Sequence, residues 1–203
     1  VSGKAANAEI VDILLRAKAE VNLEGAANRS PLMTAVKSGQ VNIVKALLDA
    51  KAHPDRGDQD GTPLLVAVEE EAERMVELLL RAKASPRAST EDGLTALHTA
   101  VYLDNEDITM LLLDAKAPIN AASYNSRVTP LIIAAANGFL RLTKLLIRGK
   151  ADVNLVDAED ETALLKAVGA CEGKVAQALL DAKATPIDPK QHPQEYDLLK
   201  GLI

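Results

Sequence analysis

The sequence predicts an all-α protein built from stacked pairs of short helices. Three observations predict this fold class. A unit of about 33 residues recurs along the 203-residue chain, apolar residues within each unit follow a helical spacing, and only 2% of the residues are aromatic. The core must therefore be filled by alanine, leucine and branched aliphatic side chains on closely packed helices.

Two sequence markers define the repeated unit. The first is Ala-Lys-Ala, at residues 17–19, 50–52, 82–84, 115–117 and 182–184, with the variant Gly-Lys-Ala at 149–151. The second is Ser or Thr, then Pro or Ala, then Leu, and it begins at Ser30, Thr62, Thr95, Thr129 and Thr162. Each second marker precedes the next lysine by 21 positions, whereas the distance from a lysine to the next marker varies from 11 to 13 positions. The segment from marker to lysine is thus a constant folded unit, joined by variable turns.

The first helix of each unit is predicted to begin directly after the Ser or Thr marker. A hydroxyl there can accept a hydrogen bond from a free N–H group of the first turn. Pro31, Pro63 and Pro130 occupy the first helical position, where the missing N–H costs nothing. A polar or glycine-containing break near 38–39, 70–71, 104–105 and 137–138 then ends this helix.

The second helix of each unit is predicted from apolar pairs four residues apart. Ile43-Val44 with Leu47-Leu48 is one example. This spacing gathers the apolar side chains on one face, which should be buried. We therefore expect five equivalent leucines to be core residues: Leu47, Leu79, Leu112, Leu146 and Leu179.

The connectors and the two ends complete the predicted architecture. Turns rich in Pro, Gly and Asp are centred near 23–29, 56–61, 88–94, 122–128 and 155–161. Aligning Lys18 with Lys51 places the start of the chain inside the first helix of a repeat, so we expect a part of a longer protein. At the other end, residues 193–203 predict a capping helix with one apolar face, because stacked repeats need covered ends. That face carries Tyr196, Leu199 and Leu202.

These units resemble the ankyrin repeat. The stretch Thr-Ala-Leu-His-Thr-Ala at 95–100 matches the family signature Thr-Pro-Leu-His-x-Ala with Ala for Pro, and 60–64 and 151–154 match the turn and the repeat end. The resemblance covers about residues 1–188 and implies an ankyrin-repeat α-solenoid with projecting β-turns. It implies a partial repeat at 1–22, then repeats at 23–55, 56–88, 89–121, 122–154 and 155–188, with a capping segment at 189–203.

The chain departs from the family pattern at two positions of the repeat. Lysine stands where the family usually has glycine after the second helix, and a left-handed backbone there costs a non-glycine residue roughly 1 kcal/mol. We expect Lys51, Lys83 and Lys116 to be left-handed or helix-terminating, with their ammonium groups in solvent. The aligned lysines either form a cationic ladder for an acidic protein or an anionic membrane surface, or reflect inherited helix-end chemistry. Apolar residues replace the signature histidine in four repeats: Met33, Leu65, Ile132 and Leu165.

The sequence offers no set of residues for catalysis or cofactor binding. The three histidines lie far apart in the repeat scheme and Cys171 is the single cysteine, so no metal site is predicted. His98 is expected to form hydrogen bonds within and between turns, and Cys171 to be a partly buried, inert thiol. No glycine-rich phosphate loop is present. We therefore predict no enzymatic activity and no cofactor.

Charge and composition also exclude several partners. A net charge of -6 and few aromatic residues argue against nucleic-acid binding. No apolar run approaches the roughly 20 residues of a membrane-spanning helix. A single cysteine fits a reducing compartment such as the cytoplasm, and the interior of an organelle stays open.

The resemblance implies a non-enzymatic scaffold that binds a protein partner through the β-turn tips and the concave surface of the first helices. An acidic patch in repeats two and three would attract a basic segment or only keep the protein soluble; it consists of Asp58, Asp60, Glu69, Glu70, Glu91 and Asp92. An apolar patch in repeats three and four would supply an interface or only pack between repeats; it consists of Leu94, Tyr102, Leu103, Tyr124 and Val128. The predicted binding residues are Asp60, Glu69, Glu70, Glu91, Asp92, Leu94, Tyr102, Leu103, Tyr124, Asn125, Val128 and Asn137.

Two alternative functions stay open at this point. The chain could be a structural accessory subunit of a larger multiprotein assembly, or the regulatory ankyrin segment of a longer channel or enzyme. Fold resemblance does not choose among these roles. A designed binder is a third possibility, but the unequal connectors argue against consensus design.

Overall fold

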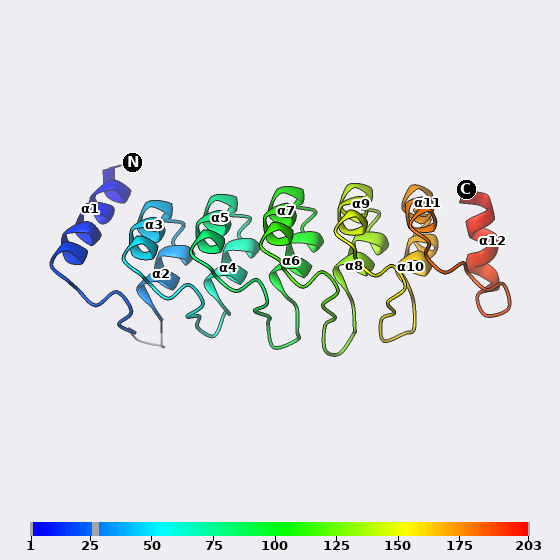
Figure 1. The fold of residues 1–203 in the computed structure, drawn as a ribbon, viewed down its shortest axis with the longest axis horizontal. Helices are drawn as coiled ribbons and strands as arrows, with labels where there is room; N and C mark the ends of the chain where they lie inside the picture. Colours follow the sequence, from blue (N-terminus) through cyan, green and yellow to red (C-terminus); the bar gives the residue numbers. More distant parts are fainter. Residues whose placement is uncertain (1, 26–28, 203) are drawn as a thin grey trace. The chain divides into compact units, whose positions relative to one another are not determined.

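A computed structural model describes residues 2–25 and 29–202 of the chain (Figure 1). The described residues form twelve α-helices and no β-strand, with isolated bridges between Asp58 and Gly61 and between Val156 and Thr162. The chain divides into an N-terminal unit, Val1–Ser89, and a C-terminal unit, Thr90–Ile203. The all-α repeat architecture is as predicted. Residues 26–28 of the first predicted turn lie outside the described residues.

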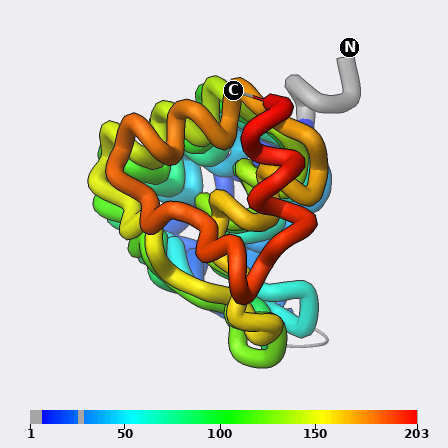
Figure 2. The backbone as a smooth tube through the Cα atoms, turned by 90° about the vertical axis from the view of Figure 1, so that its right-hand side faces the viewer, coloured from blue at the N-terminus to red at the C-terminus, as the bar shows by residue number. Residues whose placement is uncertain are grey.

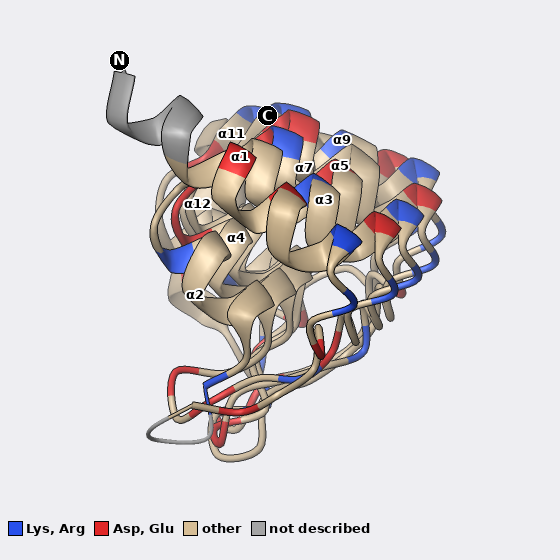
Figure 3. Ribbon diagram, turned by 90° about the vertical axis from the view of Figure 1, so that its left-hand side faces the viewer, with Lys and Arg blue, Asp and Glu red and all other residues tan. Residues whose placement is uncertain are grey.

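The N-terminal unit contains five helices. They are α1 (Ser2–Arg16), α2 (Pro31–Lys37), α3 (Val41–Asp49), α4 (Pro63–Glu69) and α5 (Glu73–Arg81). The first helices α2 and α4 pack together, and α3 packs between α1 and α5. Charged residues lie on the turns and on α3 and α5, while α2 and α4 are largely uncharged (Figure 3).

The C-terminal unit contains seven helices. Three helix pairs are followed by a single helix: α6 (Ala96–Tyr102), α7 (Glu106–Asp114), α8 (Pro130–Ala136), α9 (Leu140–Arg148), α10 (Ala163–Gly169), α11 (Gly173–Asp181) and α12 (Pro193–Leu202). The first helices stack in the order α6, α8, α10, and the second helices in the order α7, α9, α11. Helix α12 lies across α10 and α11 and buries Leu199 (Figure 2). A helix therefore covers the end of this stack.

The predicted N-caps start the first helices. In four of them a hydroxyl oxygen of the Ser or Thr marker accepts a hydrogen bond from the N–H three residues later, at Ser30, Thr62, Thr129 and Thr162. In the fifth, Thr95 and His98 form a capping box, in which the His98 ring accepts a hydrogen bond from the Thr95 N–H. Each cap satisfies a polar group that the helix leaves free, and such caps contribute about 1 kcal/mol.

The core consists of the aliphatic side chains that the repeat pattern selects. The five leucines expected in the core are all buried, with Leu79, Leu112, Leu146 and Leu179 fully inaccessible. The apolar replacements of the signature histidine are buried as well. Complete burial of a leucine side chain contributes roughly 1.5 to 3 kcal/mol, so this row of residues supplies a large part of the cohesion between helices.

Each second helix ends in a left-handed residue, and that residue is a lysine. The backbone φ angles are 68° at Lys51, 66° at Lys83 and 64° at Lys116, with similar values at the three other lysines. Two main-chain hydrogen bonds close the helix end, for example from Lys51 to the Leu48 carbonyl and from Ala52 to the Leu47 carbonyl. Lys51, Lys83 and Lys116 are exposed, as predicted.

Helix α1 is a single continuous helix. Aligning it with α2 and α3 would place a break near residues 5–6, opposite Ser38-Gly39, but α1 runs unbroken from Ser2 to Arg16. Alanines occupy positions 5 and 6, and alanine favours the helix interior, whereas Gly39 is left-handed at φ 66°. The local sequence therefore favours one continuous helix.

Candidate protein-binding surface

Each turn of the C-terminal unit is closed by a Ser, Thr or Asp side chain that accepts hydrogen bonds from main-chain N–H groups of the same turn. The Thr90 hydroxyl accepts a hydrogen bond from the Leu94 N–H at 3.2 Å, and the Ser123 hydroxyl accepts one from the Val128 N–H at 3.1 Å. Asp157 accepts from the N–H groups of Glu159 and Glu161. The residues between these anchors form the turn tips.

Adjacent turn tips are joined through the main chain. The Tyr124 N–H donates to the Asp92 carbonyl at 2.9 Å, and the Ala158 N–H donates to the Ser126 carbonyl at 2.9 Å. The Tyr124 ring lies against Gly93, where an added Cβ would come within 2.8 Å of the ring. Gly93 is also left-handed, with φ 80°, so only glycine fits without strain. The turns thereby hold Tyr124 in place although its side chain is 68% exposed.

His98 connects α6 to the next turn. The Thr95 N–H donates to Nδ1 at 3.1 Å, so Nε2 carries the proton and donates to the Val128 carbonyl at 3.0 Å. The ring is buried, and this burial lowers the pKa of His98 below its ordinary value, although the hydrogen bonds oppose the effect. His98 is therefore a neutral structural link, as the sequence predicts.

An apolar groove lies between α6 and α8, beside the turns. Its volume is about 220 Å³, and its walls are Leu94, His98, Thr99, Tyr102 and Ile133. Tyr102 stands on the rim with 68% of its surface exposed. A groove of this size accepts one or two aliphatic side chains rather than a cofactor.

The comparisons with known proteins agree with this architecture. The family model for ankyrin repeats in three copies matches residues 2–89, 53–123 and 120–191, which is nearly the whole chain. The chain belongs to the ankyrin-repeat family.

Solved structures and curated proteins of the family extend the comparison. An ankyrin repeat domain from Acinetobacter baumannii AYE superposes with a TM-score of 0.84 at 21% identity, covering 90% of this chain and 95% of that one. The ankyrin domain of Bcl-3, an IkappaB family member, gives 0.82 at 26% identity, covering 98% and 94%. Among curated proteins, human Ankyrin repeat and SOCS box protein 16 is 37% identical over 79 residues, and fission-yeast glycerophosphocholine phosphodiesterase gde1 is 35% identical over 74.

The aligned regions are short relative to those curated proteins. They span 39% of this ankyrin chain but 17% of the human protein, and 36% of this chain but 6% of the yeast phosphodiesterase. The similarity therefore concerns ankyrin repeats and not the remainder of either protein.

The ankyrin structure brings some of the predicted binding residues together. Leu94 and Tyr102 line the groove, and Tyr124 is exposed on the neighbouring turn. Val128 is half-buried, and Leu103 is half-buried at the end of α6 and does not line the groove. Asn125 and Asn137 are exposed, and the Asn137 amide donates to the Ile133 carbonyl at 2.9 Å.

Two groove residues were missed at the level of sequence. Thr99 and Ile133 occupy the same position of the first helix in successive ankyrin repeats, four residues after the capping threonine. The equivalent residue Val66 is buried, whereas Thr34 is exposed. Comparing this position across the repeats would have identified both residues as candidates, but the repeat pattern does not predict in which repeats the side chain is exposed.

The predicted acidic patch needs correction in the N-terminal unit. Asp58 has a side chain only 1% exposed and binds Lys37 Nζ at 2.7 Å and Arg29 Nε at 3.1 Å. Burial alone would raise the pKa of Asp58, but the hydrogen bonds from Lys37, the Asp60 N–H and Arg29 outweigh it and leave the pKa below its ordinary value. Asp58 is therefore a structural anchor of its turn and not a surface anion.

Asp60 is also engaged, because it forms an ion pair with Lys37. Lys37 is half-buried between these two carboxylates, whose hydrogen bonds raise its pKa. Glu69 and Glu70 are exposed at the end of α4. In the C-terminal unit, Glu91 and Asp92 are exposed and form no ion pair with any described residue. Free acidic groups thus remain at four of the predicted positions.

Cys171 is exposed, contrary to the expectation of partial burial. It occupies the left-handed position between α10 and α11, with φ 60°, which directs this residue away from the core. Within residues 2–25 and 29–202, no group of three His, Cys, Asp or Glu side chains is arranged to hold a metal ion. No described helix combines the length and apolarity that crossing a bilayer requires.

Proposed function

We propose that this ankyrin-repeat chain is a non-enzymatic scaffold that binds a protein partner through the turns and first helices of its C-terminal unit. The supporting observation is the apolar groove between α6 and α8, with Tyr102 exposed on its rim. Exposed tyrosines beside an apolar depression are typical of the centre of a protein interface, because a large side chain is desolvated there with little loss of conformational entropy.

The charges near this groove favour a partner with a basic segment. Glu91 and Asp92 lie on the turn that also supplies Leu94 and that is hydrogen-bonded to Tyr124. Because both carboxylates lack a partner in the described part of the chain, a lysine or arginine of the bound protein can pair with them. Such exposed charges accelerate association, whereas the groove supplies the binding energy.

Capture of the partner from the native source tests this proposal. The wild-type chain and Tyr102→Ala are used as bait, with Met110→Ala as the matched control, because Met110 is also an exposed apolar side chain but lies on α7. We expect Tyr102→Ala to weaken the binding of the captured protein by more than about 1 kcal/mol and Met110→Ala to leave it unchanged, as measured by calorimetry. Equal binding by all three baits would reject the groove as the site.

A permanent structural role in a larger assembly is the second candidate. It is favoured by α1, where Ile10, Ile13 and Leu14 are more than half exposed, although the equivalents of Ile10 and Leu14 in α3 are buried. Exposed apolar surface of this kind is typical of subunits that stay associated. A complex that survives gel filtration at nanomolar concentration, and that Leu14→Ser dissociates, would support this role over the scaffold.

A further inference from the structure

Helices α9 and α11, together with the left-handed lysine that follows each of them, carry several positive charges that are unpaired among the described residues. We define the α9–α11 basic face as the five exposed cations Lys144, Arg148, Lys150, Lys174 and Lys183. None of them forms an ion pair with a residue that the structure describes, and the nearby Arg141 is engaged with Glu106 at 3.4 Å. This surface belongs to a chain with a net charge of -6, so the composition as a whole does not account for it.

The internal repeat shows that this arrangement is unusual within the molecule. Lys144 and Arg148 stand four residues apart on α9. The same two positions hold Lys45 and Asp49 on α3, which pair at 2.7 Å, and Glu77 and Arg81 on α5, which pair at 2.6 Å. Opposite charges at this spacing stabilise a helix, whereas like charges destabilise it by a similar amount. Helix α9 therefore keeps a repulsive pair where α3 and α5 have attractive ones.

The two cations also line a groove between α9 and α11. Ile147 and Ala178 contribute its apolar part, and Asp181 and Ala182 complete the wall opposite Lys144 and Arg148. Asp181 accepts a hydrogen bond from Gln177 at 2.8 Å and makes no ion pair with either cation. The groove thus combines free positive charge with apolar surface.

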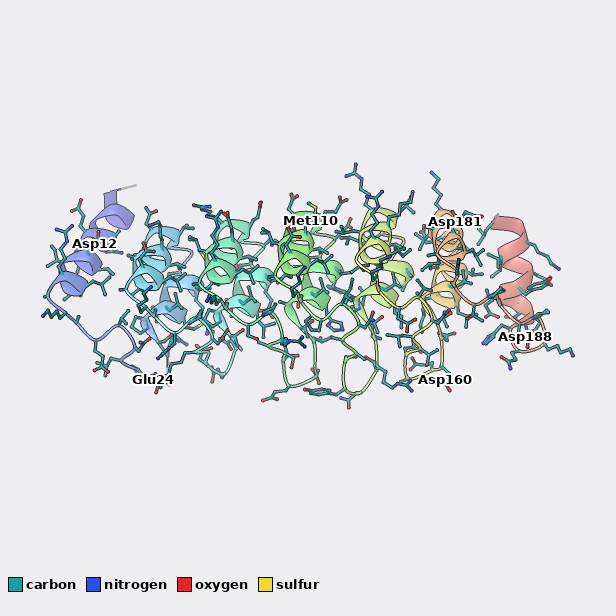
Figure 4. All side chains as sticks on the ribbon, viewed as in Figure 1. Asp12, Glu24, Met110, Asp160, Asp181 and Asp188 are labelled. Carbon is teal, nitrogen blue, oxygen red and sulfur yellow. The ribbon has the colours of Figure 1, made fainter. Side chains whose placement is uncertain are left out.

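This face lies apart from the turn tips. In the C-terminal unit, Asp181 is the last residue of α11, and Asp160 lies at a turn tip on the opposite side of the unit (Figure 4). A ligand on the α9–α11 basic face would therefore leave the turn tips accessible.

We propose that the α9–α11 basic face binds an acidic segment of another protein. Its carboxylates would pair with Lys144 and Arg148, and an aliphatic side chain would cover Ile147 and Ala178. A single-stranded nucleic acid fits less well, because the Asp181 carboxylate in the groove wall would repel its phosphates and no aromatic side chain lines the groove to stack on a base. Discrete peptide side chains can avoid Asp181.

Fluorescence anisotropy with defined probes tests this assignment. The probes are a peptide of alternating Glu and Leu, an oligo-Glu peptide of equal charge, an oligothymidylate of equal charge, and vesicles containing phosphatidylserine. The alternating peptide should bind most tightly, because it matches both the charge and the apolar floor, and its affinity should fall as salt is raised. Tighter binding of the oligonucleotide or the vesicles would overturn the proposal, as would the absence of saturable binding to the peptide.

A charge-reversed variant locates the binding. Lys144→Glu with Arg148→Glu should lower the affinity for the alternating peptide about tenfold or more. The control, Arg87→Glu with Lys190→Glu, produces the same change in net charge at two exposed positions that do not line this groove and should change the affinity less than about twofold. Equal losses in the two variants would show a general charge effect and reject the site. Ultracentrifugation of the wild-type chain alone should show a monomer, since binding of a second copy to this face would also overturn the choice of partner.

Discussion

Lys83 is a non-glycine residue in the left-handed conformation, which strains its backbone. With φ at 66°, its Cβ lies close to the following carbonyl, a strain that glycine avoids. The cation at the end of α5 offsets part of this, since the helix carbonyls there carry partial negative charge. The lysine is exposed, so neither packing nor burial holds it.

Replacing Lys83 with glycine should therefore be neutral or stabilise the fold by up to about 1 kcal/mol. Lys83→Ala is the informative companion, because it removes the charge but keeps the strained Cβ and should be neutral or slightly destabilising. Urea denaturation of the two variants measures both effects. A marked loss of stability in Lys83→Gly would reveal a side-chain contact that the structure does not show.

His98 should make stability depend on pH. Burial lowers its pKa in the folded state, so below about pH 6.5 the unfolded chain binds the proton more readily than the folded one. The contribution of neutral His98 to the free energy of unfolding is therefore fully present above that pH. It falls as the pH decreases, by at most about 1.4 kcal/mol for each pH unit. Denaturation between pH 7.5 and 5.5 should show this slope, and His98→Leu, which copies Leu165, should flatten it. An unchanged slope in the variant would assign it to other groups.

Alanine substitutions at Gly93 and Gly169 should change the stability of the fold in opposite directions. Gly93→Ala should destabilise the fold by at least about 1 kcal/mol, because the backbone is left-handed and the new Cβ would displace the Tyr124 ring. Gly169→Ala should stabilise it by roughly 0.5 to 1 kcal/mol, because no atom lies within 4 Å of the added carbon in α10. Thermal unfolding measures both, and effects of the same sign would contradict the assigned turn geometry.

At the level of helices and turns, local chemistry made most elements predictable. Capping residues such as Thr129 and the spacing of Leu112 and its equivalents are short-range signals, and both placed elements correctly. The state of individual surface groups was harder to predict. Asp58 lies in an acidic stretch, yet it binds Lys37 from 21 residues away, and no spacing rule reveals that pairing. Ile133 forms a groove wall only because its neighbours leave that space open.

At the scale of the whole molecule, local stability should rise from the first helix of the repeat array toward the interior. Within the N-terminal unit, α1 leaves Ile10, Ile13 and Leu14 exposed, whereas α5 buries Met75, Val76 and Leu79. A helix with fewer buried contacts opens more often, so amide protons of α1 should exchange faster than those of α5 by a factor of about ten or more. Hydrogen exchange read by mass spectrometry checks this, and comparable protection in both helices would contradict it.

The closed turns have a consequence for how such a surface can change. Three residues lie between Asp58 and Thr62, four between Thr90 and Thr95, and five between Ser123 and Thr129, yet each anchor still closes its turn. Length and composition at the tip can therefore vary while the capping threonine and the helix pair behind it stay the same. Substitutions at tip positions other than the left-handed Gly61 and Gly93 can therefore change specificity with little effect on folding, and foreign recognition loops can be grafted between the same anchors.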